Sequence, residues 1–114
     1  MKTINRKELK KLLDGSEELV LIDVRDSESY YNGHILHSIN IPLENIESWG
    51  KKYLYRDEKV VVYSGGFECT LSPKAREKLT RLGFKNVWDY EGGLTDWKGA
   101  GQLVEYSHKM AVGE

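Results

Sequence analysis

The chain has 114 residues, of which 39% are hydrophobic and 31% charged, and its 17 basic and 18 acidic side chains give a formal net charge of −1. This composition predicts one globular domain and excludes both a strongly basic surface for nucleic acid and an apolar run long enough to span a membrane. The N-terminal residues lack the apolar segment of a signal peptide, and the single cysteine cannot form an internal disulfide, so we expect a cytoplasmic protein.

Short runs rich in β-branched residues alternate with amphipathic segments in the first half of the chain. In chain order these are a strand at residues 3–4, a helix opened by an Asn5–Glu8 capping box and closed by Asp14-Gly15, strands at 19–24 and 38–41, a helix through Leu43, Ile46, Trp49 and Tyr53, and a strand at 59–63. The runs LVLI and VVVY are apolar without interruption, which is typical of strands covered on both faces of a parallel sheet.

The alternation continues to the C-terminal tail. In chain order it gives a helix with Ser72 as N-cap, Pro73 in the first turn and Gly83 at its end, a strand at 87–90, and a short helix marked by Leu94 and Trp97. Helices that separate buried strands predict an α/β fold with three layers, α/β/α, around a five-stranded, mostly parallel sheet. We expect residues 1–106 to form this domain and residues 107–114 to be a flexible tail.

Four short signatures occur in a fixed order along the chain. They are LIDVR at 21–25, GHI at 33–35 continuing to SINIP at 38–42, VVVY at 60–63 before a loop, and YEGGL at 90–94 followed by Asp96-Trp97. In this order they resemble the rhodanese-like domain (single-domain sulfurtransferase) family over about residues 4–105. Three of their residues are expected to support the site: Asp23 and Arg25, at the strand end where open α/β sheets bind ligands, and His34, interpreted as a hydrogen-bond partner of the loop backbone. Gly92-Gly93 is predicted to permit a close backbone turn.

The loop after the VVVY strand carries the expected chemistry. The resemblance implies a catalytic cysteine directly after this strand, where backbone N–H groups and a helix dipole stabilise a thiolate and its persulfide. Here that position holds Ser64, which cannot carry sulfane sulfur and is interpreted as a hydroxyl that satisfies loop amides. Cys69, in the same loop, is the remaining candidate nucleophile, and an inert, buried cysteine is the alternative interpretation.

The other residues of the 64–71 loop are the predicted substrate-binding residues: Gly65, Gly66, Phe67, Glu68, Thr70 and Leu71. Glu68 favours the neutral thiol and repels a dianion, so we expect weak activity with thiosulfate. Phe67 lies in the middle of the loop, where a substrate or a partner could meet it. The spacing of Trp49, Trp88 and Trp97 instead assigns these side chains to the core.

Two functions remain open on the sequence alone. The first is a sulfurtransferase that moves sulfane sulfur from a donor to a thiol or protein acceptor through a persulfide on Cys69, with no cofactor and no metal. The second is a catalytically inactive module of the same fold that binds anions or a partner protein. A sulfur atom of Cys69 directed at the loop amides favours the enzyme, and one directed into the core favours the module. No nucleic acid or membrane partner is expected, and the oligomeric state stays open.

Overall fold

The computed structural model describes residues 2–106, so the predicted tail at 107–114 lies outside the described residues. In chain order the elements are β1 (Thr3–Ile4), α1 (Arg6–Asp14), β2 (Val20–Asp23), α2 (Ser27–Tyr31), β3 (His34–Ile35), β4 (Ile39–Asn40), a 3₁₀ turn (Leu43–Asn45), α3 (Ile46–Tyr53), β5 (Lys59–Tyr63), α4 (Leu71–Arg81), β6 (Asn86–Tyr90), α5 (Gly93–Gly99) and β7 (Val104–Glu105). None of the helices within residues 2–106 is both long and apolar enough to cross a membrane.

The central sheet has five strands in the order β1-β6-β5-β2-β4, and every neighbouring pair is parallel. The strands end level with one another, since Tyr63 pairs with Asp23 on one side and with Tyr90 on the other. The loops that follow β2, β5 and β6 therefore leave the sheet at the same edge, which is where ligands bind in open α/β sheets. The predicted five-stranded parallel sheet is confirmed.

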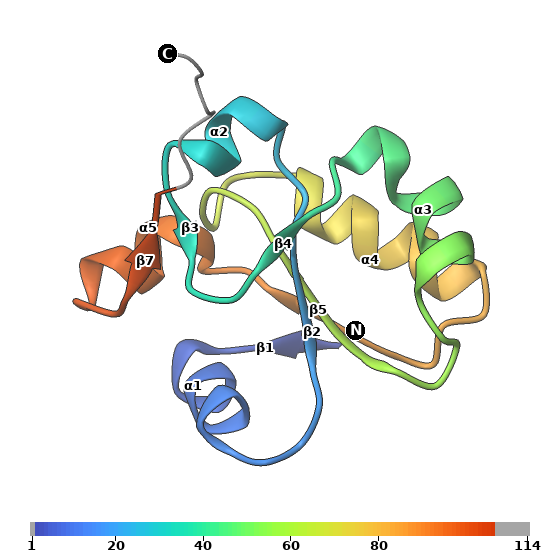
Figure 1. Cartoon of the computed structure of the whole chain (residues 1–114), viewed down its shortest axis with the longest axis horizontal. Helices are drawn as coiled ribbons and strands as arrows, with labels where there is room; N and C mark the ends of the chain where they lie inside the picture. Colours follow the sequence, from blue (N-terminus) through green and yellow to red (C-terminus); the bar gives the residue numbers. More distant parts are fainter. Residues whose placement is uncertain (1, 107–114) are drawn as a thin grey trace.

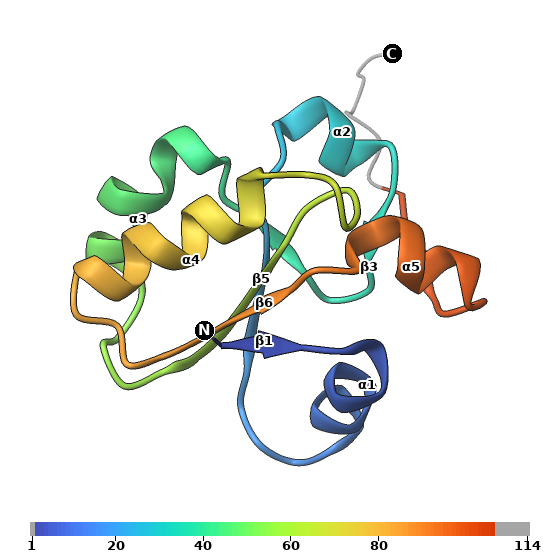
Figure 2. The ribbon, with the colours of Figure 1, turned by 180° about the vertical axis from the view of Figure 1, so that it is seen from behind.

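Helices cover both faces of this sheet, as Figures 1 and 2 show from opposite sides. Side chains alternate along β5, because successive residues of a strand point to opposite faces. Val60 and Val62 pack in the cluster formed with α3 and α4, and Val61 and Tyr63 pack in the cluster formed with α1 and α5. Two separate cores thus hold the sheet between two helical layers, and the predicted three-layer α/β/α architecture is confirmed.

Local signals locate one helix start correctly and misplace another. In α1 the Asn5 side chain accepts from the Glu8 N–H at 2.8 Å and the Glu8 carboxylate accepts from the Asn5 N–H at 2.9 Å, so the predicted capping box is present. Helix α4 was expected to have Ser72 as its N-cap but begins earlier, with Thr70 at the N-cap position. Ser72 lies inside the first turn because its hydroxyl faces inward and accepts a hydrogen bond from Ser64.

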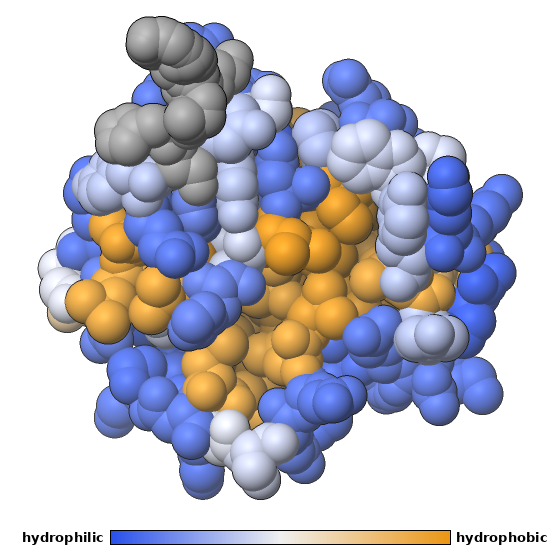
Figure 3. All heavy atoms as spheres, viewed as in Figure 1, coloured by the Kyte–Doolittle hydropathy of each residue, from blue (hydrophilic) through white to orange (hydrophobic). Residues whose placement is uncertain are grey.

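Two surface features were not expected. Trp49, assigned to the core from its spacing, is 39% exposed, because α3 buries Ile46 and Gly50 and leaves Trp49 on its flank. Apolar surface also gathers over β2 and β4 in the face seen in Figure 3, where Ile39 of the edge strand β4 is 45% exposed. This edge strand has only two residues, which limits its pairing with another chain.

Candidate functional site

The loop between β5 and α4 is held in place by the first turn of α5. The Leu94 N–H donates to the Ser64 carbonyl at 3.0 Å, and the Thr95 N–H donates to the Gly65 carbonyl at 2.9 Å. Gly93 makes this approach possible: its φ is +61°, and a Cβ there would lie 2.5 Å from the Ser64 carbonyl oxygen. The close backbone turn predicted at Gly92-Gly93 is therefore present, and it fixes the shape of the loop.

Cys69 closes a turn within this loop and is half-buried. Its N–H donates to the Gly66 carbonyl at 3.0 Å, which folds the end of the loop back over its beginning. Burial is the largest influence on the thiol and raises its pKa, but hydrogen bonds from the Ser64 hydroxyl and from the Leu71 and Gly65 N–H groups outweigh it, so the pKa of Cys69 is lowered. The sulfur thus faces loop amides, and the fraction of thiolate at neutral pH is larger than in an ordinary cysteine.

The Ser64 hydroxyl was expected to hydrogen-bond to loop amides, but it pairs with another side chain. The side chain is 1% exposed and its Oγ lies 3.3 Å from the Ser72 Oγ; when its single proton is directed at Cys69 instead, it lowers the pKa of that thiol. Ser64, at the position where the resemblance implies a cysteine, therefore lies beside the thiol that this chain carries.

A fixed positive charge is the third influence on the thiol. Arg25 forms a bidentate ion pair with Asp23, with its Nη2 2.7 Å from one carboxylate oxygen and its Nε 3.0 Å from the other. The same Nη2 donates to the Gly33 carbonyl at 2.7 Å, and the Asn40 side-chain amide donates to the Arg25 carbonyl at 2.9 Å. The guanidinium is therefore immobilised, and its charge lowers the pKa of Cys69.

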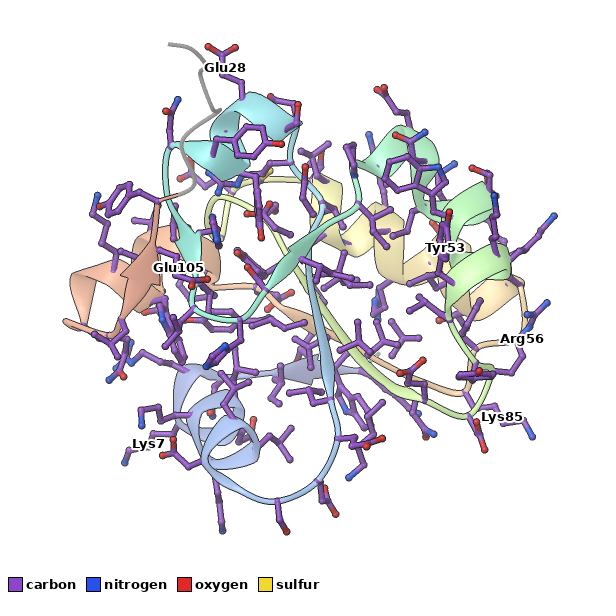
Figure 4. All side chains as sticks on the ribbon, in the orientation of Figure 1. Lys7, Glu28, Tyr53, Arg56, Lys85 and Glu105 are labelled. Atoms are coloured by element: carbon purple, nitrogen blue, oxygen red, sulfur yellow. The ribbon has the colours of Figure 1, made fainter. Side chains whose placement is uncertain are left out.

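His34 was expected to hydrogen-bond to the loop backbone, but its ring bonds instead to the last turn of helix α2. It is 1% exposed, its Nδ1 donates to the Tyr30 carbonyl at 2.7 Å, and its ring stacks on the Tyr30 ring with centroids 3.7 Å apart. Its Nε2 lies 3.3 Å from the carboxylate of Glu105, whose side chain reaches toward β3 in Figure 4. These contacts join α2 to the β3–β7 pair, so His34 supports the scaffold.

An open pocket of about 610 Å³ lies over the loop. Its lining residues are Gly65, Gly66, Phe67, Glu68, Cys69, Gly92, Thr95 and Asp96, so four of the six predicted substrate-binding residues border it. Thr70 does not border this pocket and is the N-cap residue of α4. Leu71 lines a separate pocket beside α2 and α3, but its backbone N–H stabilises the Cys69 thiolate. No basic side chain borders the Cys69 pocket.

The sequence did not indicate Thr95 and Asp96 as neighbours of the pocket. Asp96 is held by the Arg6 guanidinium at 2.6 Å and by the Tyr90 hydroxyl at 2.6 Å. Both partners come from other elements, so no spacing within α5 predicts this arrangement. Among residues 2–106, no group of three His, Cys, Asp or Glu side chains converges as metal ligands would.

Proteins of similar structure agree with the signatures in the sequence. The solution structure of the rhodanese-like domain of an Anabaena protein superposes with a TM-score of 0.85 and is 28% identical, covering 100% of this chain and 88% of that one. The crystal structure of thiosulfate sulfurtransferase from Pseudomonas aeruginosa superposes with a TM-score of 0.82 and is 29% identical, covering 94% of this chain but 20% of that one.

Sequence relatives are often longer than this chain. The Escherichia coli protein YibN is 31% identical over 102 residues, which is 87% of this chain and 68% of the relative. An HTH-type transcriptional regulator of Mycobacterium tuberculosis is 31% identical over 97 residues, and the chain spans 42% of it. For two further curated relatives the chain spans only 22% and 50% of their length. The family model named "Rhodanese-like domain" matches residues 5–100, and the chain therefore belongs to the rhodanese-like domain family.

Proposed function

We propose that this chain is a sulfurtransferase that carries sulfane sulfur as a persulfide on Cys69. The observation that supports this function is the environment of the sulfur atom, which faces the Ser64 hydroxyl and the N–H groups of Leu71 and Gly65. The thiolate is the nucleophile in such chemistry, and hydrogen bonds to the charged form are what populate it.

The transfer consists of two displacements at sulfur. The Cys69 thiolate attacks the outer sulfur of the donor, forming an S–S bond, and the donor leaves with the electron pair of the bond that breaks. The acceptor thiolate then attacks the terminal sulfur of the persulfide, and the Cys69 thiolate is released. The same N–H groups that stabilise the thiolate are placed to stabilise the negative charge of the persulfide between these steps.

The charge around the pocket favours one class of donor. Glu68 and Asp96 border the pocket and no basic side chain does, so a small dianion such as thiosulfate meets repulsion there. A sulfur atom presented as a persulfide on another thiol or on a protein carries less charge. We therefore expect this class of donor to be preferred, with a thiol or a protein as the acceptor.

The experiment is intact-mass spectrometry of the full chain after incubation with a polysulfide donor. We expect a gain of about 32 Da, removed by a thiol acceptor and absent in Cys69→Ser. Because the chain has a single cysteine, the adduct needs no peptide mapping. A wild-type protein without the adduct, under conditions that load an active sulfurtransferase, would reject this function.

One observation favours the second candidate, a catalytically inactive module. The family's cysteine position holds the buried Ser64, so the usual nucleophile is absent. Such a module would use the same pocket to bind an anion or a partner protein. A chain that gains no persulfide but binds thiosulfate or sulfate in calorimetry would support it, and Gly66→Asp would then abolish that binding by adding a like charge to the pocket.

A further inference from the structure

The tip of the loop after β5 presents an aromatic side chain to solvent beside Cys69. The hydrogen bond of 3.0 Å from the Cys69 N–H to the Gly66 carbonyl closes a four-residue turn, and Phe67 and Glu68 are the two central residues of that turn. Phe67 is 72% exposed. Because α5 holds the first residues of the loop through two backbone hydrogen bonds, the turn carries Phe67 at a fixed place next to the thiol.

A second pocket adjoins the Cys69 pocket at Phe67. It has a volume of about 450 Å³ and is bordered by β1, the first turn of α1, the end of β6 and α5. The two pockets share Phe67, Gly92 and Asp96 in their linings. Helices α1 and α5 lie on the same side of the sheet in Figures 1 and 2, and the Arg6–Asp96 ion pair of 2.6 Å joins them here. The residues that line the two pockets therefore form one surface, which we call the Phe67 surface.

Negative charge exceeds positive charge on the Phe67 surface. Its charged residues are the acidic Glu8, Glu68, Glu91 and Asp96 and the basic Arg6 and Lys7. Arg6 and Asp96 neutralise each other, and Lys7 extends from α1 into solvent in Figure 4. Glu68 and Glu91 are exposed, and neither takes part in any of the ion pairs within residues 2–106. The formal excess of two negative charges is complementary to a basic partner.

The size of the Phe67 surface indicates an occupant larger than a small sulfur compound. The Cys69 pocket alone has about 610 Å³, and the adjoining pocket, which Cys69 does not line, adds about 450 Å³. A small donor would contact a fraction of this surface and leave Phe67 in water. Aromatic side chains are enriched among the residues that contribute most to protein–protein binding, and a preorganised one costs little ordering entropy when a partner covers it.

We propose that the Phe67 surface docks a basic segment of the protein that delivers sulfur to Cys69. An apolar side chain of the segment packs on Phe67, and its basic side chains face Glu68 and Glu91. A persulfide on a cysteine of the segment then enters the Cys69 pocket. The S–S bond of this persulfide breaks as the Cys69 thiolate bonds to its outer sulfur, and the partner's cysteine leaves as a thiolate with the electron pair. The nature of the cargo rests on the proposed function, whereas the docking rests on the shape and charge of the surface.

The experiment measures whether a peptide protects Cys69 of the full chain from alkylation by iodoacetamide. The basic probe is a short capped peptide with a leucine and a serine at its centre and arginines on both sides, and the acidic probe has glutamates in place of the arginines. At about pH 9 the thiolate predominates, so the charge of the peptide has little effect on the thiol itself. We expect the basic peptide to slow alkylation and the acidic one to leave the rate unchanged. Added salt should raise the concentration of basic peptide that gives half-protection, because it screens exposed charges.

Two variants test the contacts, each compared with its own rate without peptide. Phe67→Ala removes the aromatic contact, and Glu91→Lys reverses a charge that borders only the adjoining pocket. Each should raise the half-protecting concentration of basic peptide by at least about fivefold. Glu18→Lys is the matched control: it makes the same change in net charge at an exposed residue before β2, at the opposite end of the parallel sheet, and should protect like wild type.

Equal protection by the two peptides, no protection by either, or an equal loss in Glu18→Lys and Glu91→Lys would overturn the docking proposal. Thiosulfate that protects at the same concentration as the basic peptide would assign the surface to a small anion, and a dimer in sedimentation that Phe67→Ala dissociates would assign it to a second copy; both results also overturn it. Protection by the basic peptide in a chain that gains no persulfide would reject sulfur transfer alone. A persulfide adduct without protection would reject the docking alone.

Discussion

Gly93→Ala is the substitution that most directly tests how the loop is held. A Cβ at this position would lie 2.5 Å from the Ser64 carbonyl oxygen and 2.8 Å from the Gly66 nitrogen, so backbone atoms must move. The φ of +61° adds about 1–2 kcal/mol for a residue with a Cβ, and overpacking against backbone adds about 1–3 kcal/mol. We therefore expect Gly93→Ala to lower the free energy of unfolding by about 2–5 kcal/mol.

Urea denaturation followed by circular dichroism measures this loss, and Gly99→Ala is the control in the same helix. A Cβ at Gly99 meets no atom within 4 Å, so this change should be neutral or stabilise the protein by up to about 1 kcal/mol. Gly93→Ala should also displace the loop N–H groups that stabilise the Cys69 thiolate, so alkylation of Cys69 at pH 7 should be slower. If the two variants unfold at the same urea concentration, the close contact between α5 and the loop does not exist in solution.

Three further predictions concern the site and its support. Wild-type thiosulfate:cyanide activity is expected to be weak or absent and to rise in Ser64→Cys, measured as thiocyanate; strong wild-type activity that persists in Cys69→Ala would refute our account of the loop. Tyr63→Phe should cost about 1–3 kcal/mol in urea denaturation, because the Tyr63 hydroxyl accepts from the buried Ile35 N–H at 2.9 Å and that donor would be left unpaired; a loss no larger than in the exposed control Tyr53→Phe would contradict it. The folded-state pKa of Asp89 is raised above its ordinary value near 3.8, so the protonated side chain contributes to the stability of the folded protein. This contribution to the free energy of unfolding is complete below about pH 3.8 and is lost as pH rises through the folded-state pKa. Asp89→Asn should therefore be more stable than wild type at pH 7, with the difference shrinking toward about pH 4, and a difference that grows on acidification would contradict the raised pKa.

Local patterns were sufficient for most of the fold. The strand predicted at residues 59–63 has those bounds in the structure, because VVVY is apolar on both faces and a central parallel strand buries both. The start of α1 was found because both halves of its capping box lie within four residues of each other. Such signals need no knowledge of the rest of the molecule.

The parts of the site that escaped prediction depend on contacts between distant segments. Nothing near Asp96 in the sequence shows that the Arg6 guanidinium holds its carboxylate. The start of α4 was misplaced for the same reason, since Ser72 has the residue type of an N-cap but uses its hydroxyl in a buried contact with Ser64. A residue type predicts a cap only while no tertiary contact competes for its side chain.

Ser64 and Cys69 are five residues apart in the sequence but lie beside each other in the structure, because the loop folds back on itself. The hydrogen bond from the Cys69 N–H to the Gly66 carbonyl turns the loop back toward its first residues. The Cys69 sulfur therefore lies beside the Ser64 hydroxyl and the Gly65 N–H. Helix α5 holds Ser64 and Gly65 through their carbonyls, and the Gly65 N–H, which shares a peptide group with the Ser64 carbonyl, is thereby fixed beside the sulfur. Apart from the Ser64 hydroxyl, the groups that lower the pKa of Cys69 are the N–H groups of Leu71 and Gly65 and the charge of Arg25. We therefore expect the proposed persulfide on Cys69 to be stabilised by the same groups that stabilise its thiolate.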